Sequence, residues 1–229
     1  MIKEFKDIWE LFEKEVFAKD SRPGPKGLFN QYLDDDKRYD NEKGHLIRRE
    51  NLKEYLKSFE KVPKTILVGE APGYRGCRFS GVPFTSEKQI CDPSFKIFKN
   101  GERSSIREKP WSEAAATTFW DTMESARLNF FVWNCVPFHL YDGEKSELNN
   151  RAPEISEIEE CGEILSDILD CLKPQRIIAL GRKAEISLKK LKALKKIEVA
   201  DIEYIRHPGR GGAREFREKI RKKAYLFPQ

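Results

Sequence analysis

The sequence contains no run of about 18 apolar residues, the length that a membrane-spanning helix requires. Its first residues, from Met1 to Asp7, also lack the apolar centre and the small-residue cleavage site of a secretory signal peptide. We therefore expect a cytoplasmic protein with no membrane partner.

Cysteine motifs are also missing. The cysteines are odd in number and widely spaced, and no CxxC pair or Cys and His set with the spacing of a zinc site occurs. Cysteines of this kind stay reduced in a cytoplasm, so we expect no disulfide framework and no bound metal. The five are Cys77, Cys91, Cys135, Cys161 and Cys171.

Two nucleotide-binding motifs are absent as well. The sequence has no GxGxxG run and no Gly-Lys pair followed by Ser or Thr, which excludes the dinucleotide fingerprint and the P-loop. What the chain does contain is enough apolar material for a core. Its 15 Phe, 7 Tyr and 4 Trp exclude a disordered chain, and 229 residues suit a single α/β domain.

Positive charge is concentrated near the C-terminus. From Gly181 to Gln229 there are 15 Lys and Arg against 6 Asp and Glu, a balance of +9, while the other residues sum to −4. A basic end on a mildly acidic chain indicates a polyanionic partner such as DNA. Solvated helix faces are the alternative explanation of the same charges.

The spacing of apolar residues predicts a regular succession of elements. From residue 64 onward strands and helices alternate, which predicts a four-stranded parallel sheet between helices, a three-layer α/β/α sandwich. We expect one domain over residues 1–229, with residues 1–62 as a helical extension packed on it. Residues 28–43 are aspartate-rich and predicted to be a loop. The predicted helices are 5–16, 45–61, 114–128, 153–172, 182–194 and 214–225, and the strands are 64–68, 130–133, 176–180 and 202–205.

Unusual sequence follows three of the four predicted strands. The first runs into GEAPG at residues 69–73 and then GVPFTS at 81–86, the second into Asn134, and the fourth into HPGRGG at 207–212. Each segment alone is typical of a tight turn. Because ligands bind beyond the carboxyl ends of parallel strands, together they predict a cleft with an aromatic ring, a carboxamide and an imidazole.

This ordered set of motifs resembles the uracil-DNA glycosylase superfamily and is most similar to its family 4 branch, from about Lys64 to the C-terminus. The resemblance implies a monofunctional DNA glycosylase of base excision repair. Such an enzyme hydrolyses the N-glycosidic bond of uracil flipped out of single- or double-stranded DNA. For this chain we expect a monomer without a cofactor.

The resemblance also implies roles for single residues. Asn134 matches the carboxamide that pairs with O4 and N3–H of uracil, and His207 matches the imidazole that stabilises negative charge at O2. Glu70 is the carboxylate expected to orient water or stabilise an oxocarbenium ion. We therefore predict Glu70, Asn134 and His207 as the catalytic residues.

Further positions are expected to bind the base and the DNA. Phe84 matches the aromatic ring that stacks on uracil. Gly69, Ala71 and Gly73, in the same loop as Glu70, are expected to bind the base. The residues expected to contact the DNA backbone are Thr85, Ser86, Arg210, Gly211 and Gly212, with Arg210 entering the gap left by the flipped base.

Three departures from the family pattern matter. Ala71 stands where better-known branches have the water-activating Asp. Gly73 stands where several have a tyrosine that excludes the methyl group of thymine, which predicts a roomier pocket that also takes other deaminated bases. Of the iron–sulfur cysteines typical of family 4, only Cys161 matches, so we expect no cluster.

Two other classes of function remain open. Ala71 favours a non-catalytic DNA-binding protein of the same fold. A nucleotide- or nucleoside-binding α/β protein would use the same edge of the sheet.

Overall fold

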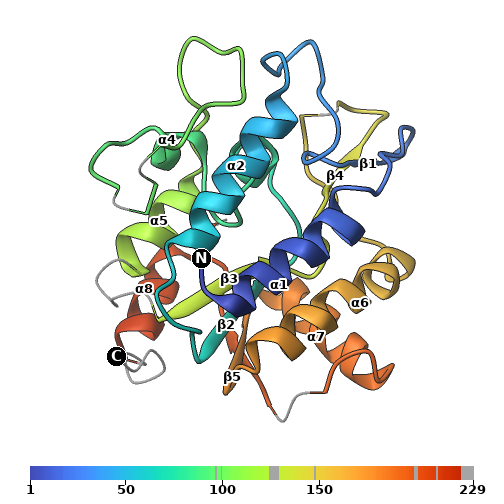
Figure 1. Cartoon of the computed structure of the whole chain (residues 1–229). Helices are drawn as coiled ribbons and strands as arrows, with labels where there is room; N and C mark the ends of the chain where they lie inside the picture. Colours follow the sequence, from blue (N-terminus) through green and yellow to red (C-terminus); the bar gives the residue numbers. More distant parts are fainter. Residues whose placement is uncertain are drawn as a thin grey trace. The chain divides into compact units, whose positions relative to one another are not determined.

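A computed structural model of the chain describes residues 1–95, 97–98, 100–123, 129–146, 148–198, 201–209 and 211–222 (Figure 1). The chain divides into two compact units, each assembled from three segments. Unit 1 comprises Met1–Glu60, Ala71–Glu113 and Phe138–Ala152, and unit 2 comprises Lys61–Glu70, Ala114–Pro137 and Pro153–Gln229.

Unit 2 contains the predicted parallel sheet. Its strands lie in the order β3-β2-β5-β6, and every neighbouring pair is parallel. The two central strands, β2 and β5, consist almost entirely of buried residues, which explains why each reads as a short continuous apolar run. The bounds are β2 (Thr65–Gly69), β3 (Phe130–Asn134), β5 (Arg176–Leu180) and β6 (Ile202–Ile205).

Helices flank this sheet, so the predicted α/β/α architecture is confirmed. Helix α7 (Arg182–Ala193) packs on β5, β6 and α6 (Ile155–Leu172), and α5 (Ala114–Met123) packs on α8 (Ala213–Lys222). Residues 124–128 and 223–225, which were also predicted to be helical, lie outside the described residues. Within the described part of the chain, no helix has the length and apolar character needed to cross a bilayer.

Unit 1 is built from helices and one small antiparallel ribbon. Strands β1 (Lys26–Phe29) and β4 (His139–Asp142) pair with each other, so the prediction of a loop over 28–43 is wrong at its first two residues. The two predicted N-terminal helices are present, the first ending in a π-helical turn. The remaining elements are α1 (Lys3–Leu11), η1 (Phe12–Val16), α2 (Gly44–Lys57), α3 (Cys77–Ser80) and α4 (Glu87–Ile90).

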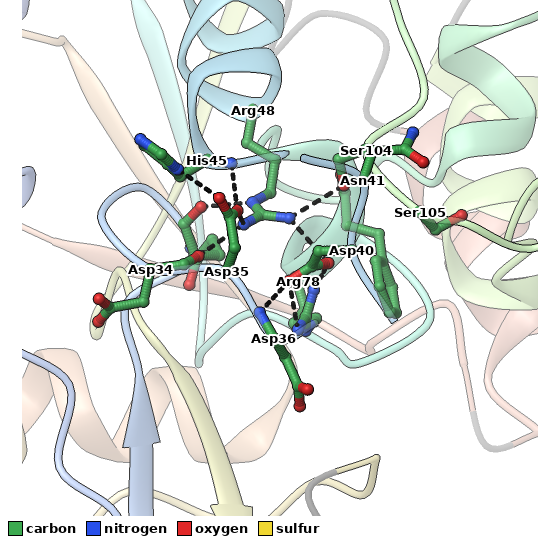
Figure 2. A network of polar contacts seen from close by, with 12 residues as sticks. Asp34, Asp35, Asp36, Asp40, Asn41, His45, Arg48, Arg78, Ser104 and Ser105 are labelled. Carbon is green, nitrogen blue, oxygen red and sulfur yellow. Dashed lines mark hydrogen bonds and ion pairs between the residues drawn. The ribbon is translucent and has the colours of Figure 1, made fainter. Parts of the chain in front are cut away.

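A buried network of ion pairs joins the N-terminal segment of unit 1 to the segment that follows β2 (Figure 2). The guanidinium of Arg48 is fully buried and donates to Asp40, Asp35, Ser104 and the carbonyl groups of residues 31 and 34. These bonds use all five of its N–H donors. Burial lowers the pKa of Arg48 to about 10, and the Asp40 carboxylate opposes that change.

Asp40 also forms an ion pair with a second arginine, Arg78. Its two carboxylate oxygens accept both terminal nitrogens of Arg78, at 2.5 and 3.0 Å, and Arg78 lies on α3. The guanidinium of Arg78 also lies over the rings of Phe29 and Phe79, at 4.3 and 4.1 Å from their centroids. The short helix α3, which directly follows the GEAPG loop, is therefore fixed to the N-terminal segment by charge-assisted hydrogen bonds.

Candidate functional site

The strand order of unit 2 identifies the edge where a ligand is expected. The chain runs from β2 to β3 on one side and then crosses to β5 and β6 on the other, so the order reverses between β2 and β5. In open parallel sheets, ligands bind beyond the carboxyl ends of the strands at such a reversal. Glu70 follows β2 there, and Gly181 and Lys183 follow β5.

Glu70 is held at this reversal from two sides. Beyond the end of the strands, the backbone N–H groups of Cys135 and Val136 donate to the carbonyl oxygens of Gly69 and Glu70, at 2.9 and 3.0 Å. The carboxylate of Glu70 lies 3.7 Å from the ammonium group of Lys183, in the first turn of α7. An anionic carboxylate is thereby placed at the carboxyl edge of the sheet beside the end of β3.

Asn134 is the last residue of β3 and is directly opposite Gly69 in the sheet register. Only 3% of its surface is exposed. Asn134 therefore lies at the carboxyl edge of the sheet, where a carboxamide can offer both a donor and an acceptor to a ligand.

His207 follows β6, at the same edge of the sheet. The backbone N–H of Gly209 donates to Nδ1 of its ring, at 3.0 Å. Because Nδ1 accepts this hydrogen bond, the proton of the neutral ring resides on Nε2. The loop thus fixes the tautomer in which Nε2 is a donor, the form required to stabilise negative charge on a ligand.

Three glycines pack closely around His207. A Cβ atom at Gly181 would lie 2.9 Å from His207 Cβ, and one at Gly209 would lie 3.1 Å from its Nδ1. A Cβ at Gly212 would lie 2.1 Å from the His207 carbonyl oxygen, so Gly212 is required by the loop itself. Gly211 is exposed with nothing within 4 Å of a Cβ, and Arg210 lies outside the described residues.

The lysines of α7 and of the turn that follows it do not form a purely positive surface. Lys189 pairs with Glu185 of the same helix at 2.7 Å, and Lys190 and Lys196 pair with Glu159 and Glu163 of α6. Carboxylates therefore offset much of the local positive charge at these positions. The net charge of the C-terminal segment overstates the field that DNA would meet on this helix.

In unit 1, the residues after Glu70 form a tight loop. The carbonyl oxygen of Gly73 accepts the N–H groups of Gly76 and Arg78, and the N–H of Tyr74 donates to the side chain of Asn150 at 2.9 Å. The carbonyl oxygen of Pro72 accepts Nδ1–H of His139, at 3.1 Å. Burial lowers the pKa of His139 to about 3, so the ring is neutral and acts as a fixed support for the loop.

Phe84 lies in a strained turn of unit 1. Its φ angle is +52°, a region that bulky residues rarely adopt and that costs about 1–3 kcal/mol. The Ser80 hydroxyl bonds to the carbonyl oxygens of Val82 and Thr85 and accepts the N–H of Val82, which holds the turn. Strain of this kind, over-determined by its surroundings, is typical of functional sites.

Thr85 and Ser86, predicted to contact DNA phosphates, are fully buried. The hydroxyl of Thr85 donates to the Pro83 carbonyl oxygen at 3.0 Å, and that of Ser86 donates to the Gln89 side chain at 2.6 Å in the capping box of α4. Both hydroxyl groups therefore serve the local fold, a use that their sequence context did not indicate. Their burial argues against a direct contact with phosphate.

Glu113 is a residue that the sequence did not single out. Its carboxylate lies against Gly73 and Gly76, on the side to which a Cβ of either glycine would point. The missing side chain at position 73 therefore leaves no open space there. In the sequence, Glu113 lies in a polar segment and resembles a surface residue. Only the packing of the loop shows that its carboxylate lies against the two glycines.

The donor set for an iron–sulfur cluster does not fit. Among the described residues, no group of three or more His, Cys, Asp or Glu side chains is placed to hold a metal ion. Burial raises the pKa of the Cys135 thiol and so opposes the thiolate form that such a cluster needs. The absence of a cluster from the protein stays a prediction.

Residues 56–226 match the family model described as the uracil DNA glycosylase superfamily. The match covers more than half of the chain, and the chain belongs to this superfamily. Membership indicates a glycosylase-type enzyme whose relatives act on DNA. A comparison with curated proteins finds no match.

Proposed function

We propose that the protein is a monofunctional DNA glycosylase that hydrolyses the N-glycosidic bond of uracil flipped out of DNA. The observation that carries this proposal is the position of Asn134, which has only 3% of its surface exposed and lies opposite Gly69 in the sheet register. It ends β3 at the carboxyl edge of the parallel sheet, where ligands bind in folds of this kind.

Uracil fits the hydrogen-bonding capacity of Asn134. An amide NH₂ group donates to O4, and the amide oxygen accepts N3–H, so both halves of the side chain are satisfied. Cytosine presents an amino donor at position 4 and an acceptor at N3, which leaves polar groups of the site unpaired. Sites that pair with specific polar groups reject mismatched ligands strongly, so we expect little excision of cytosine.

His207 and Glu70 supply the rest of the proposed chemistry. As the bond between C1′ and N1 breaks, its electrons move into the uracil ring and negative charge collects at O2. A donor fixed at Nε2 of His207 stabilises that charge. The Glu70 carboxylate stabilises the oxocarbenium ion and orients the water that attacks C1′.

The proposal extends to partners and context. Phe84 stacks on the base, Gly69, Ala71 and Gly73 surround it, and the exposed Gly211 allows the DNA backbone to approach. Base excision repair, a monomeric state, a cytoplasmic location and the lack of a cofactor are part of the same proposal. Ala71 supports one alternative, a non-catalytic DNA-binding protein, because the usual water-activating carboxylate is missing there.

Excision from a labelled oligonucleotide containing one uracil tests the proposal, with strand cleavage by alkali after incubation as the signal. Wild type and the exposed-residue control Lys61→Ala should cleave equally. Asn134→Ala and His207→Ala should each lose roughly 100-fold or more, because each removes a preorganised hydrogen-bonding group from the site. Circular dichroism should show that all variants remain folded.

The failures are informative. If wild type binds DNA in a salt-sensitive way but leaves uracil in place, the non-catalytic alternative is favoured. If it binds no DNA, a nucleotide- or nucleoside-binding function is favoured instead.

A further inference from the structure

The segment between α4 and α5 presents an apolar and a cationic side chain to solvent. Within residues 105–111, which we call the Arg107 loop, Ile106 has 54% of its surface exposed, and its neighbour Arg107 is exposed too. Single exposed apolar side chains are common on proteins. Ile106 therefore gains meaning only from the residues around it.

The backbone of the Arg107 loop is fixed by buried groups. The fully buried carboxylate of Glu87 accepts the N–H and the hydroxyl of Ser105, at 2.8 and 2.6 Å, and the N–H of Trp111, at 3.0 Å. Between these residues, the N–H of Ile106 donates to the carbonyl oxygen of Tyr39 at 2.9 Å. Because one carboxylate holds both ends, the loop is ordered in advance and loses little further freedom when a ligand binds.

Arg107 lies over an aromatic ring. The central carbon of its guanidinium group is 4.1 Å from the centroid of the Trp111 ring. Trp111 stacks in turn on the buried ring of Phe79, with the centroids 5.1 Å apart and 15° between the planes. A guanidinium group placed in this way keeps its charge and its N–H donors for a ligand.

Arg75 repeats this arrangement next to Arg107. The central carbon of its guanidinium group lies 5.2 Å from the centroid of the Tyr74 ring. The Tyr74 ring meets the Trp111 ring edge-on, with centroids 6.1 Å apart. Two arginine–aromatic pairs are therefore neighbours, and all four residues belong to the same segment of unit 1.

Carboxylates do not neutralise these two arginines. Among the described residues, neither Arg75 nor Arg107 forms an ion pair, the adjacent Glu108 included. Burial raises the pKa of the Glu113 carboxyl group to about 7, and the guanidinium of Arg75 opposes this increase, so near neutral pH the group carries only part of a charge. In contrast to the paired lysines near α7, these arginines leave positive charge for an external anion.

We infer that the Tyr74–Arg75 pair and the Arg107 loop bind a single strand of DNA. Phosphate oxygens accept the N–H donors of the two arginines, and an unpaired base packs on Ile106 and on the guanidinium of Arg107. A duplex turns its bases inward and offers mainly phosphates and sugars, so an exposed isoleucine beside an arginine favours a single strand. The inference rests on the proposed function only for the nature of the polyanion, DNA.

Fluorescence anisotropy with a labelled oligothymidylate of about 16 nucleotides tests the phosphate contacts. The strand contains no uracil, so binding is measured without excision. Arg75→Ala and Arg107→Ala should each weaken binding roughly threefold to tenfold and lower the slope of log affinity against log salt by about 0.7. Lys6→Ala, which removes an exposed cation of α1 in the same unit, should change neither quantity. Unchanged affinity and slope in both arginine variants would overturn the inference.

A strand of abasic spacers with the same number of phosphates tests the contact with bases. Wild type should bind the oligothymidylate more tightly than this strand. Ile106→Ala should reduce that preference roughly threefold and leave the salt slope unchanged, because it removes an apolar contact and no charge. Circular dichroism checks that the variants are folded. If Ile106→Ala keeps the full preference, the surface binds phosphate alone and the inference is wrong.

Polyglutamate tests an acidic peptide as the alternative partner. It has no bases, so it should displace the oligothymidylate only at concentrations roughly tenfold or more above those of an unlabelled strand with the same number of charges. Equal competition by the two polymers, with both weakened to the same extent in Arg75→Ala and Arg107→Ala, would assign the surface to acidic peptides and overturn the inference.

These outcomes are distinguishable from the outcome of the excision experiment. If wild type excises uracil while both arginine variants bind the oligothymidylate as tightly as wild type, the inference fails and the proposed function stands. If wild type excises nothing but the variants lose affinity as expected, the proposed function fails and the inference stands.

Discussion

His207 illustrates how one loop prepares a single side chain for chemistry. The Gly209 N–H fixes its tautomer, and the Cβ-free face of Gly181 leaves space for its own Cβ. Gly181 has a φ of +96°, so its conformation also favours glycine over other residues. The residue that follows β5 therefore determines where the imidazole after β6 can lie.

Gly181→Ala should displace His207 and lower uracil excision roughly tenfold or more, because small displacements of catalytic groups cost large factors in rate. It should also destabilise the fold by about 1–2 kcal/mol through its positive φ. Excision rates and urea denaturation measure the two effects. Gly24→Ala is the matched control, since Gly24 has a φ of +123° but nothing within 4 Å of its Cβ position. Equal loss of excision in both variants would contradict a specific contact with His207.

Residues that resemble surface charge or turn residues were the hardest to interpret from sequence. Thr85 and Ser86 suited a phosphate contact by type, yet their hydroxyl groups satisfy the backbone and a helix cap in a buried turn. Nothing in the sequence indicated where the Glu113 side chain lies, because its position depends on the two glycines that it contacts. The placement of Asn134 and His207 at one edge of the sheet could be predicted, because the carboxyl ends of parallel strands share an edge.

Among the elements of unit 1, the short helix α3 depends most on charges. Asp40 lies between Arg48 of α2 and Arg78 of α3, and all three side chains are buried. Breaking such a set by removing one partner leaves buried charges without compensation.

Asp40→Asn should destabilise the fold by about 3–5 kcal/mol, because two buried guanidinium groups lose their shared carboxylate. Urea denaturation followed by circular dichroism measures the change. Glu163→Ala, which removes an exposed ion pair with Lys196, should cost less than about 1 kcal/mol. A similar cost in both variants would show that Asp40 is not a structural centre of unit 1.

Regular elements were predictable to the extent that apolar periodicity determines them. The strands of the parallel sheet and helices α6 and α7 follow from continuous or 3.6-residue patterns. The β1–β4 ribbon and α3 were missed because they are short and because long-range pairing, rather than local preference, forms them. Arg48 and Asp40 also look like solvated charges in the sequence, which conceals how the N-terminal segment is anchored.

The stability of the whole molecule should depend on pH through His139. Its pKa is about 3 in the folded state and roughly 6.5 in an unfolded chain, so the unfolded state binds more protons between these values. Its contribution to stability is therefore fully present above about pH 6.5 and is lost progressively as the pH falls toward 3.

His139→Gln removes this titration while keeping a donor for the Pro72 carbonyl oxygen. We expect wild type to lose stability relative to this variant by up to about 1.4 kcal/mol for each pH unit below 6.5. Urea denaturation of both proteins at pH 7, 6 and 5 measures the difference. Glu113 is present in both proteins, so its opposing effect cancels. A constant difference across these pH values would contradict the burial of a neutral His139.

The alternation of segments between the two units has a consequence for protein synthesis. Because unit 1 includes residues 138–152, it cannot be completed until well over half of the chain has left the ribosome. Unit 2 begins at Lys61 but obtains β5 and β6 only from the last quarter of the chain. Unit 1 can therefore be completed before unit 2, whereas Glu70, whose partner Lys183 follows β5, reaches its final environment only late in biogenesis.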